Sequence, residues 1–407
     1  MPSFRSMGQA GCLTLSLLGG TTQANWDTEF RGGLEAQVRL FTRDAPSPQD
    51  ANVHSSYSLQ PELKATSTSQ DSVFASKLFY RKDFIDSRRT HWDVREFKLE
   101  RRWEGTAVTV GVDSVFWGKT ESQNLVDVVN QRDGVEGVFT DEKLGQPMLR
   151  LRHVASGGVF EGYYLPYSRK ATYAGRHGRL RTQPGIDGER AQYRTGAEQW
   201  YPGMALRWEP SLEDVEMGLS AFHGLSRDPS FTPILKDGEP WFAPVYGAVT
   251  QLGVDAQYVT DETLYKLEGI YRWNQLDLVL DKRNYAAVTV GIEHTIGAFL
   301  EGSGDLGLIL EYNRDGIGKR SVNVLEDDVV IGLRYTLNDF ADTYLLATVA
   351  VDRIYGSKLF KAELTRRLGE SLRLRLEAFA PSLRDDEEFI YGYRRDASIS
   401  TSLTYYW

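Results

Sequence analysis

The chain has no long apolar run, although its 407 residues leave ample room for one. A membrane-spanning helix needs about 20 consecutive, predominantly apolar residues. The mean hydropathy of -0.40 is also too low for a bundle of such helices. The sequence therefore does not predict a helical membrane protein.

Cysteine and positive charge are also scarce. The only cysteine is Cys12, so no disulfide framework can form within the chain. Lysine and arginine number 47 against 56 aspartates and glutamates, a net charge of -9, and no basic tract interrupts this acidic balance. An acidic chain of this kind is not expected to bind nucleic acid.

The motifs of common catalytic and metal sites are missing. The six histidines do not show the spacing of a metal motif, and no G-x-S-x-G nucleophile elbow is present. Residues 118–120 mimic the end of a phosphate-binding loop, but Asp113 occupies the position of its first glycine. No fixed-period repeat suggests a propeller or solenoid. We therefore predict no cofactor, no metal and no enzyme activity.

The first 24 residues have the parts of a secretory signal peptide. Arg5 forms a thin basic region, residues 12–18 a short apolar region, and Thr22 to Ala24 a small-residue cleavage site. Cleavage after Ala24 would remove the only cysteine and Arg5, leaving 46 basic and 56 acidic residues, a net charge of -10. We predict a signal peptide at 1–24 and a single domain at 25–407.

The chain is rich in segments in which apolar and polar residues alternate, and its last eleven residues show this pattern most clearly. One face of this stretch carries Ile399, Leu403, Tyr405 and Trp407, and the other is almost entirely serine and threonine. Strict alternation is typical of a strand with two different faces. A small polar inner face and an apolar outer face suit a strand between water and lipid.

The same alternation recurs throughout the chain. In the first such segment, the apolar residues Leu34, Ala36, Val38 and Leu40 alternate with the polar residues Glu35, Gln37 and Arg39. Near Arg95 the phase slips, which indicates a β-bulge. The eighteen predicted strands centre on 34–40, 57–65, 74–80, 92–101, 108–116, 149–151, 159–166, 200–208, 215–221, 252–258, 265–271, 286–292, 306–312, 329–335, 344–352, 360–364, 372–378 and 397–407.

The connections alternate in length as well. Short turns such as 67–71 and 104–105 are followed by long segments such as 118–146 and 168–199. Short periplasmic turns and long extracellular loops are typical of a membrane barrel. We predict an all-β fold: a single transmembrane antiparallel up-and-down β-barrel of about 18 strands. The connection at 353–357 is so short that sixteen strands remain an alternative.

The aromatic end of the final strand, Tyr405 and Trp407, resembles that of bacterial outer-membrane barrels. The strand number and the arginine-bearing inner face are similar to alginate-export-type porins. Trp117-Gly118 and the Asn-x-x-Asp pattern at 130–133 resemble a box in little-characterised porin-like barrels. The resemblance implies location in a Gram-negative outer membrane and recognition of the C-terminal strand by the barrel-assembly machinery.

The segment from Phe116 to Asp133 is the first candidate site. Its apolar residues have helix-like spacing, framed by Glu121, Asp127 and Asp133. The segment could fold into the barrel mouth, narrow the lumen and present carboxylates to a solute. It could equally be an ordinary external loop packed on the rim.

A basic, aromatic stretch at 168–199 is the second candidate. It could attract anionic solutes or sugars, or bind lipopolysaccharide phosphates. A solvated loop is the interpretation that we favour.

The predicted inner face is the third candidate. Rings of one charge select ions of the other, but opposite charges can also pair between neighbouring strands, and we favour pairing. The basic side chains predicted to line the lumen are Arg39, Arg150, Arg152, Lys266, Arg272, Arg334, Lys361, Arg373 and Arg375. The acidic side chains predicted on the same face are Glu35, Glu216, Asp255, Glu268, Glu293, Glu311, Glu363 and Glu377.

We therefore predict a passive channel for small hydrophilic solutes, with anionic solutes or an acidic polysaccharide as the sharper hypothesis. Its expected partners are the solute, outer-membrane lipid and lipopolysaccharide. One alternative is a lipid-acting enzyme using His153, His223 or His294 as a base. Another is a plugged structural or adhesive barrel.

Overall fold

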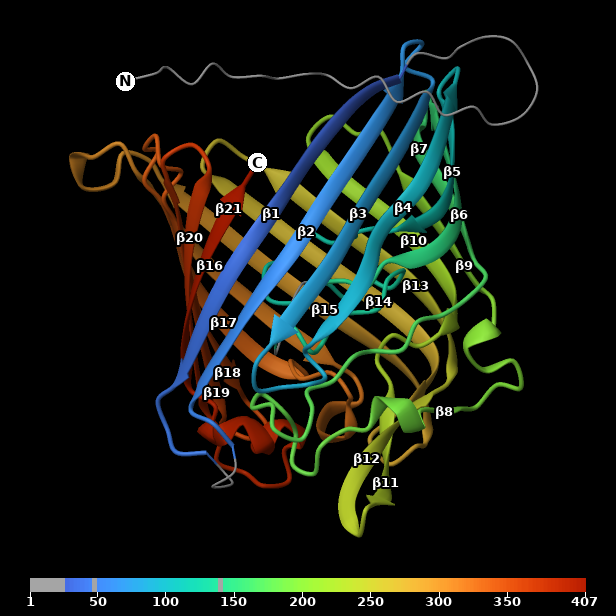
Figure 1. Cartoon of the computed structure of the whole chain (residues 1–407). Helices are drawn as coiled ribbons and strands as arrows, with labels where there is room; N and C mark the ends of the chain where they lie inside the picture. Colours follow the sequence, from blue (N-terminus) through green and yellow to red (C-terminus); the bar gives the residue numbers. More distant parts are fainter. Residues whose placement is uncertain (1–25, 46–49, 138–141) are drawn as a thin grey trace, which may run out of the picture.

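Eighteen antiparallel strands form one sheet that closes on itself (Figure 1). This computed structural model describes residues 26–45, 50–137 and 142–407, so the predicted signal peptide lies outside the described residues. The sheet closes because β1, Trp26–Phe41, pairs with both β2, Val53–Ser67, and the final strand β21, Ser398–Tyr406. Closure gives every strand two hydrogen-bonded neighbours and removes the sheet edges.

The strands follow the chain in up-and-down order. Between β2 and β21 the wall consists of β3 Ser72–Asp83, β4 His91–Trp103, β5 Thr106–Asp113, β6 Gln146–Ala155, β7 Gly158–Leu165, β9 Gly203–Glu209, β10 Val215–Leu225, β13 Ala248–Val259, β14 Thr263–Leu276, β15 Lys282–Ile296, β16 Asp305–Asp315, β17 Asp327–Thr336, β18 Tyr344–Asp352, β19 Lys358–Leu368 and β20 Leu372–Ser382.

Short and long connections alternate around the barrel, as predicted. The strands are joined at one end by turns such as 104–105 and 156–157, and at the other by segments such as 114–145 and 166–202. We call these the short-turn end and the long-loop end. With eighteen strands, β1 begins and β21 ends at the short-turn end (Figure 1).

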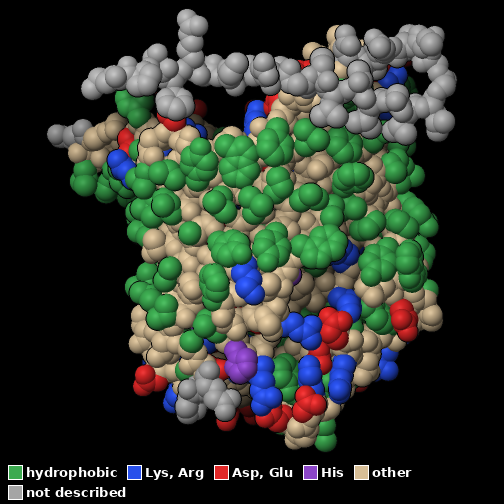
Figure 2. Space-filling view, viewed as in Figure 1, with side chains coloured by type: hydrophobic (Ala, Val, Ile, Leu, Met, Phe, Trp, Pro, Cys, Tyr) green, Lys and Arg blue, Asp and Glu red, His purple; other side chains and the backbone are tan. Residues whose placement is uncertain are grey.

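The outer face of the wall is apolar. On β1, Leu34, Val38 and Leu40 are each almost half exposed, whereas Gln37 between them is buried toward the lumen. Figure 2 shows apolar side chains over the barrel wall and charged side chains gathered at the long-loop end. A contiguous apolar surface around a closed barrel is typical of contact with lipid, and closure satisfies the backbone hydrogen bonds within a membrane.

Aromatic side chains mark both ends of this apolar surface. The rings of Tyr258 and Tyr265 stack at 6.2 Å beside a short turn, and those of Tyr405 and Trp407 stack at 6.3 Å at the chain end. Trp92, at the opposite end, is 73% exposed. Two aromatic belts are typical of barrels that span a bilayer.

The predicted strands are confirmed, including those on both sides of 353–357, so the barrel has eighteen strands and not sixteen. The β-bulge is confirmed too. Lys77 pairs with Glu96 and Leu78 pairs with Val94, which leaves Arg95 as the extra residue.

A small three-stranded sheet outside the barrel wall was not predicted. It contains β8 Gln192–Tyr193, β11 Ser230–Lys236 and β12 Glu239–Tyr246, and its parallel β12–β8 pairing joins two different long connections. The connections also contain five 3-10 helices: η1 Gly188–Arg190, η2 Glu198–Trp200, η3 Phe299–Glu301, η4 Gly318–Arg320 and η5 Phe389–Arg395. In the described ranges, no helix has the length and apolarity needed to cross a membrane.

Candidate functional site: a constriction inside the barrel

The connection between β5 and β6 turns into the barrel instead of lying on its rim (Figure 1). We call residues 114–137 of this connection the inner segment. Its Val126, Val128 and Val129 are at most 2% exposed. The interior position is the first of the two alternatives that the sequence left open.

An apolar patch on the inner wall receives these valines. Burying each such side chain contributes about 1.5–3 kcal/mol, so the patch favours the folded-in position. Polar residues would dominate this face in a water-filled barrel. The patch and the segment together form one buried cluster: Val115, Trp117, Val126, Val128, Val129, Met148, Tyr163, Leu165, Ala205, Phe222, Val249, Ile270, Tyr285 and Ala287.

Glu268, on β14, holds the first turn of the inner segment. Its carboxylate accepts hydrogen bonds from the backbone N–H groups of Lys119 at 2.7 Å, Thr120 at 3.1 Å and Val126 at 3.3 Å. The Glu268 side chain is fully buried. A charged acceptor strengthens such bonds, so Glu268 fixes the backbone at several points.

Glu311, on β16, also holds the backbone of the inner segment. Its two carboxylate oxygens accept the backbone N–H groups of Glu121 and Ser122, each at 2.8 Å. The Gln123 amide then donates to Asn313 Oδ1 at 2.8 Å. Two wall carboxylates therefore position the tip of the segment.

At this tip, Glu121 forms an ion pair with Arg334 on β17, with Oε2 and Nη2 2.5 Å apart. Arg334 also lies 3.1 Å from the carboxylate of Glu293 on β15. The side chains of Glu121 and Arg334 are 26% and 29% exposed. Unlike the buried anchors, this pair faces water.

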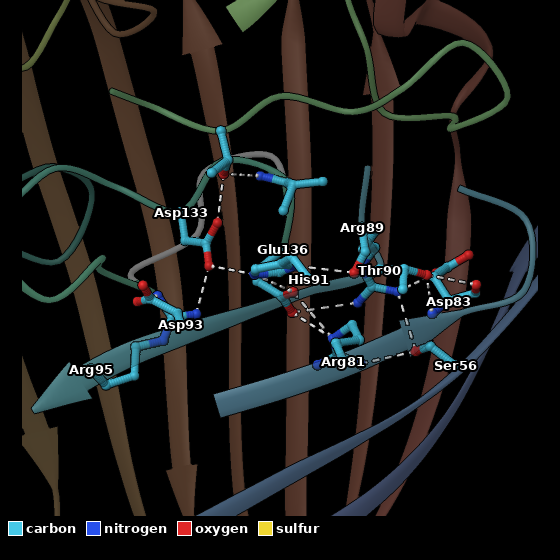
Figure 3. Close-up of polar contacts among 12 residues, drawn as sticks. Ser56, Arg81, Asp83, Arg89, Thr90, His91, Asp93, Arg95, Asp133 and Glu136 are labelled. Carbon is cyan, nitrogen blue, oxygen red and sulfur yellow. Dashed lines mark hydrogen bonds and ion pairs between the residues drawn. The ribbon is translucent and has the colours of Figure 1, made fainter. Parts of the chain in front are cut away.

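The far end of the segment is held by an arginine-rich wall (Figure 3). Asp133 pairs with Arg95 at 2.5 Å and lies 3.1 Å from His91 Nε2, and Glu136 pairs with Arg81 at 2.8 Å. Burial alone would raise the pKa of Asp133, but the His91 hydrogen bond and the Arg95 charge hold it well below its usual range. Asp133 therefore remains ionised at its anchor.

His91, Asp133 and Glu136 bring their ligand atoms within 4.8 Å of one another, a spacing that could hold a metal ion. The surroundings oppose that role, because each carboxylate is already paired with a guanidinium. A further guanidinium, of Arg89, lies 3.6 Å from Glu136. Positive charge of this density repels a cation, so the cluster serves as an ionic lock.

Two further contacts secure the middle of the segment. Arg227, in the connection between β10 and β11, donates to the carbonyl of Val129 at 2.9 Å and to that of Val128 at 3.2 Å. Asp127 pairs with Lys143 at 2.5 Å. The side chains of Asp127 and Asp133 are 5% and 0% exposed. In this structure neither carboxylate faces water, so both position the segment.

Charged side chains on the wall opposite the anchored side remain partly exposed. On β20 and β19, the side chains of Arg375 and Glu363 are 43% and 40% exposed and lie 4.0 Å apart. Glu268 and Asp255, on the inner face of the anchored side, are 0% exposed. The inner segment thus lies against one side of the lumen, while Arg375 and Glu363 on the other side remain partly exposed. Toward the long-loop end, the inner-face residues Val330, Ala350 and Leu359 of β17 to β19 are instead buried with Ile390 of η5.

The remaining predicted inner-face cations mostly have polar partners. Arg150 and Arg152 lie 2.7 and 3.5 Å from Glu161, and Arg39 donates to Ser400 Oγ at 2.9 Å. These contacts agree with pairing between neighbouring strands. Lys361 and Arg373 lie on β19 and β20, on the side opposite the inner segment.

The basic stretch at 168–199 is not the solvated loop that the sequence favoured. Arg179 is buried and pairs with Asp396 at 2.9 Å. The backbone N–H of Gly175 donates to Asp86, in the connection between β3 and β4, at 2.9 Å. This stretch therefore crosses the long-loop end and joins connections from distant strands.

The sequence placed Glu268 and Glu311 on the inner face but gave no sign that they hold backbone N–H groups. Alternation identifies the face of a side chain and not its partner. Apolar residues on the inner face of β6 to β15 are a second signal of an inserted segment, beside the apolar spacing within the segment itself.

Fold and site together define a porin-like transmembrane β-barrel with a partly filled lumen. No family model matches the chain, and no curated protein matches it. A triple-mutant porin of Rhodopseudomonas blastica is 13% identical, with a TM-score of 0.44 over 93% of this chain and 100% of that chain. Vibrio cholerae OmpT, an outer membrane protein in its trimer form, is 10% identical, with a TM-score of 0.47 over 94% and 99%. At these values the similarity is one of barrel form alone.

Proposed function

We propose that the protein is a passive channel of the bacterial outer membrane for small hydrophilic solutes. The observation that carries this proposal is the asymmetric lumen. The inner segment is fixed against one side, while charged side chains such as Arg375 and Glu363 remain exposed on the other. Lumen width, the constriction and the charge lining then decide what diffuses through.

A more specific hypothesis is that the channel passes anionic solutes or an acidic polysaccharide. Arg373 and Arg375 lie on the inner face of the side opposite the inner segment, and Arg334 lies at the constriction. Glu363 and Glu377 oppose this preference on the same wall, directly paired in register on β19 and β20. The expected selectivity for anions is therefore modest.

Planar-bilayer recordings of the refolded mature protein test the channel. We expect steady single-channel conductance and, in a salt gradient, a reversal potential displaced toward anions. A barrel that is correctly folded yet carries no current, in wild type and after deletion of 122–133, would overturn the proposal and favour the plugged structural or adhesive alternative.

The lipid-acting alternative depends on three outward-facing histidines, and each is paired across strands with a threonine hydroxyl. His153 lies 2.9 Å from Thr106 Oγ1. The other two pairs, at the same distance, are His223 with Thr250 and His294 with Thr263. Within the part of the chain that the structure describes, none of the three imidazoles forms an ion pair with a carboxylate that would make it a stronger base. We therefore infer a channel and not an enzyme.

A further inference from the structure

A concave pocket lies at the long-loop end of the barrel, near the first residue of β21. It has a volume of about 390 Å³ and is formed by two residues that follow β1, by the end of β20 and by the connection between β20 and β21, which includes η5. Its lining residues are Arg43, Asp44, Ser382, Leu383, Arg394 and Arg395. Half of them are arginines, so the pocket is basic.

These arginines differ from most others in the chain because they lack acidic partners. Within the described ranges, no carboxylate lies at ion-pair distance from Arg43, Arg394 or Arg395. Arg43 donates to the backbone carbonyl of Arg394 at 2.7 Å, and Arg394 lies 4.3 Å above the ring of Tyr391. The contacts that orient Arg43 and Arg394 are thus with neutral groups and leave their positive charges without an ion-pair partner among the described residues.

A buried arginine from another connection fixes the pocket backbone. Arg179 donates to the carbonyl of Arg43 at 3.0 Å and also to that of Arg395. Its own charge is compensated by Asp396 at 2.9 Å. Both walls of the pocket are therefore tied to one buried group before any ligand arrives, which lowers the ordering cost of binding.

We propose that this pocket binds a phosphate-bearing anion. Guanidinium groups recognise phosphate oxygens through paired, charge-assisted hydrogen bonds, and three arginines line this pocket. Asp44 also lines the pocket, so the three arginines and one carboxylate sum to a formal charge of +2, which matches a phosphate dianion. The phosphate could belong to a lipid of the outer leaflet, because the pocket lies on the barrel rim, or to a soluble solute.

Lipid binding measured by native mass spectrometry tests the pocket independently of conduction. The probes are phosphatidic acid, which has a phosphate monoester headgroup, and phosphatidylcholine as the control lipid. We expect Arg395→Gln to weaken retention of phosphatidic acid about tenfold, the effect of losing one charged hydrogen bond. The Arg43→Gln, Arg394→Gln, Arg395→Gln triple variant should abolish it.

Arg384→Gln is the matched control, because Arg384 is exposed in the same connection but does not line the pocket. Inorganic phosphate distinguishes the two sources. If it displaces the lipid at low concentration, the ligand is a soluble phosphate, and if it does not, the ligand is a lipid headgroup. Equal losses in Arg384→Gln and Arg395→Gln, or retention of phosphatidic acid by the folded triple variant, would overturn the proposal.

Discussion

Glu121 and Arg334 meet across the lumen although 213 residues separate them in the sequence. The pair joins the tip of the inner segment to β17, and both side chains are more than one-quarter exposed. The nearby anchors of the segment are buried backbone-to-carboxylate contacts. Glu121 and Arg334 are therefore the constriction residues best placed to act on a passing ion.

Glu121→Gln should increase anion selectivity with little change in stability. The substitution removes one negative charge beside Arg334, whereas the backbone N–H of residue 121 still donates to Glu311. A partly exposed ion pair contributes at most about 1 kcal/mol. Reversal potentials in a salt gradient measure the effect, and Asp237→Asn, in the β11–β12 turn, is the control outside the lumen. Equal selectivity in wild type and Glu121→Gln would show that Glu121 does not line the conducting path.

Glu268→Gln should loosen the inner segment. An amide offers one neutral acceptor oxygen in place of the carboxylate that accepts backbone N–H groups of the segment. Hydrogen bonds to a charged group contribute about 1.5–3 kcal/mol each, so we expect a loss of about 2–4 kcal/mol of unfolding free energy together with noisier, larger currents. Denaturant unfolding in lipid measures the first effect. Glu262→Gln, in a short exposed turn, should match wild type, and a quiet current in a stable Glu268→Gln would contradict the anchoring role.

Arg375→Ala, alone or with Arg373→Ala, should reduce the preference for anions. Arg375 is 43% exposed on the wall opposite the inner segment, and its removal leaves the nearby glutamates in excess. Arg367→Ala removes the same charge at the short-turn end, where Arg367 pairs with Asp342 at 3.1 Å. A selectivity change that is equal in Arg375→Ala and Arg367→Ala would mean that only overall charge matters.

The long-loop end should loosen as pH rises. Burial, followed by repulsion from Asp352 and Asp328, raises the pKa of Glu326 to about 8. Burial, with repulsion from Asp352 and Asp385, raises the pKa of Glu388 to about 7. A carboxyl group with a raised folded-state pKa stabilises the fold fully below the pKa of an exposed glutamate, and this stability is lost as pH rises through the folded value.

The rate of limited proteolysis at residues 383–397, measured between about pH 5 and about pH 9, reports this loss of stability. In wild type, cleavage should accelerate as pH rises toward about 8 and level off above that value. The Glu326→Gln, Glu388→Gln double variant should show a flatter profile, because its amides do not ionise. A wild-type rate that stays level across this range, after correction for the protease, would contradict the raised pKa values.

The strands could be predicted from sequence because two-residue alternation directly reports the two faces of a barrel wall. Even the bulge at Arg95 and the strands flanking 353–357 followed from this pattern. The partners of Glu268 and Arg179 could not be predicted, because they belong to irregular connections whose contacts depend on the closed barrel. The parallel pairing of β8 with β12 is long-range in the same way and has no local signal.

Cysteine accessibility tests most directly whether solutes pass beside the inner segment. The predicted mature chain, 25–407, contains no cysteine, so single cysteines can be introduced without background. A charged methanethiosulfonate reagent added during bilayer recording should reduce the current stepwise in Arg375→Cys and leave Val128→Cys unchanged, because residue 128 is only 2% exposed. A current that responds at residue 128 and not at residue 375 would contradict the account.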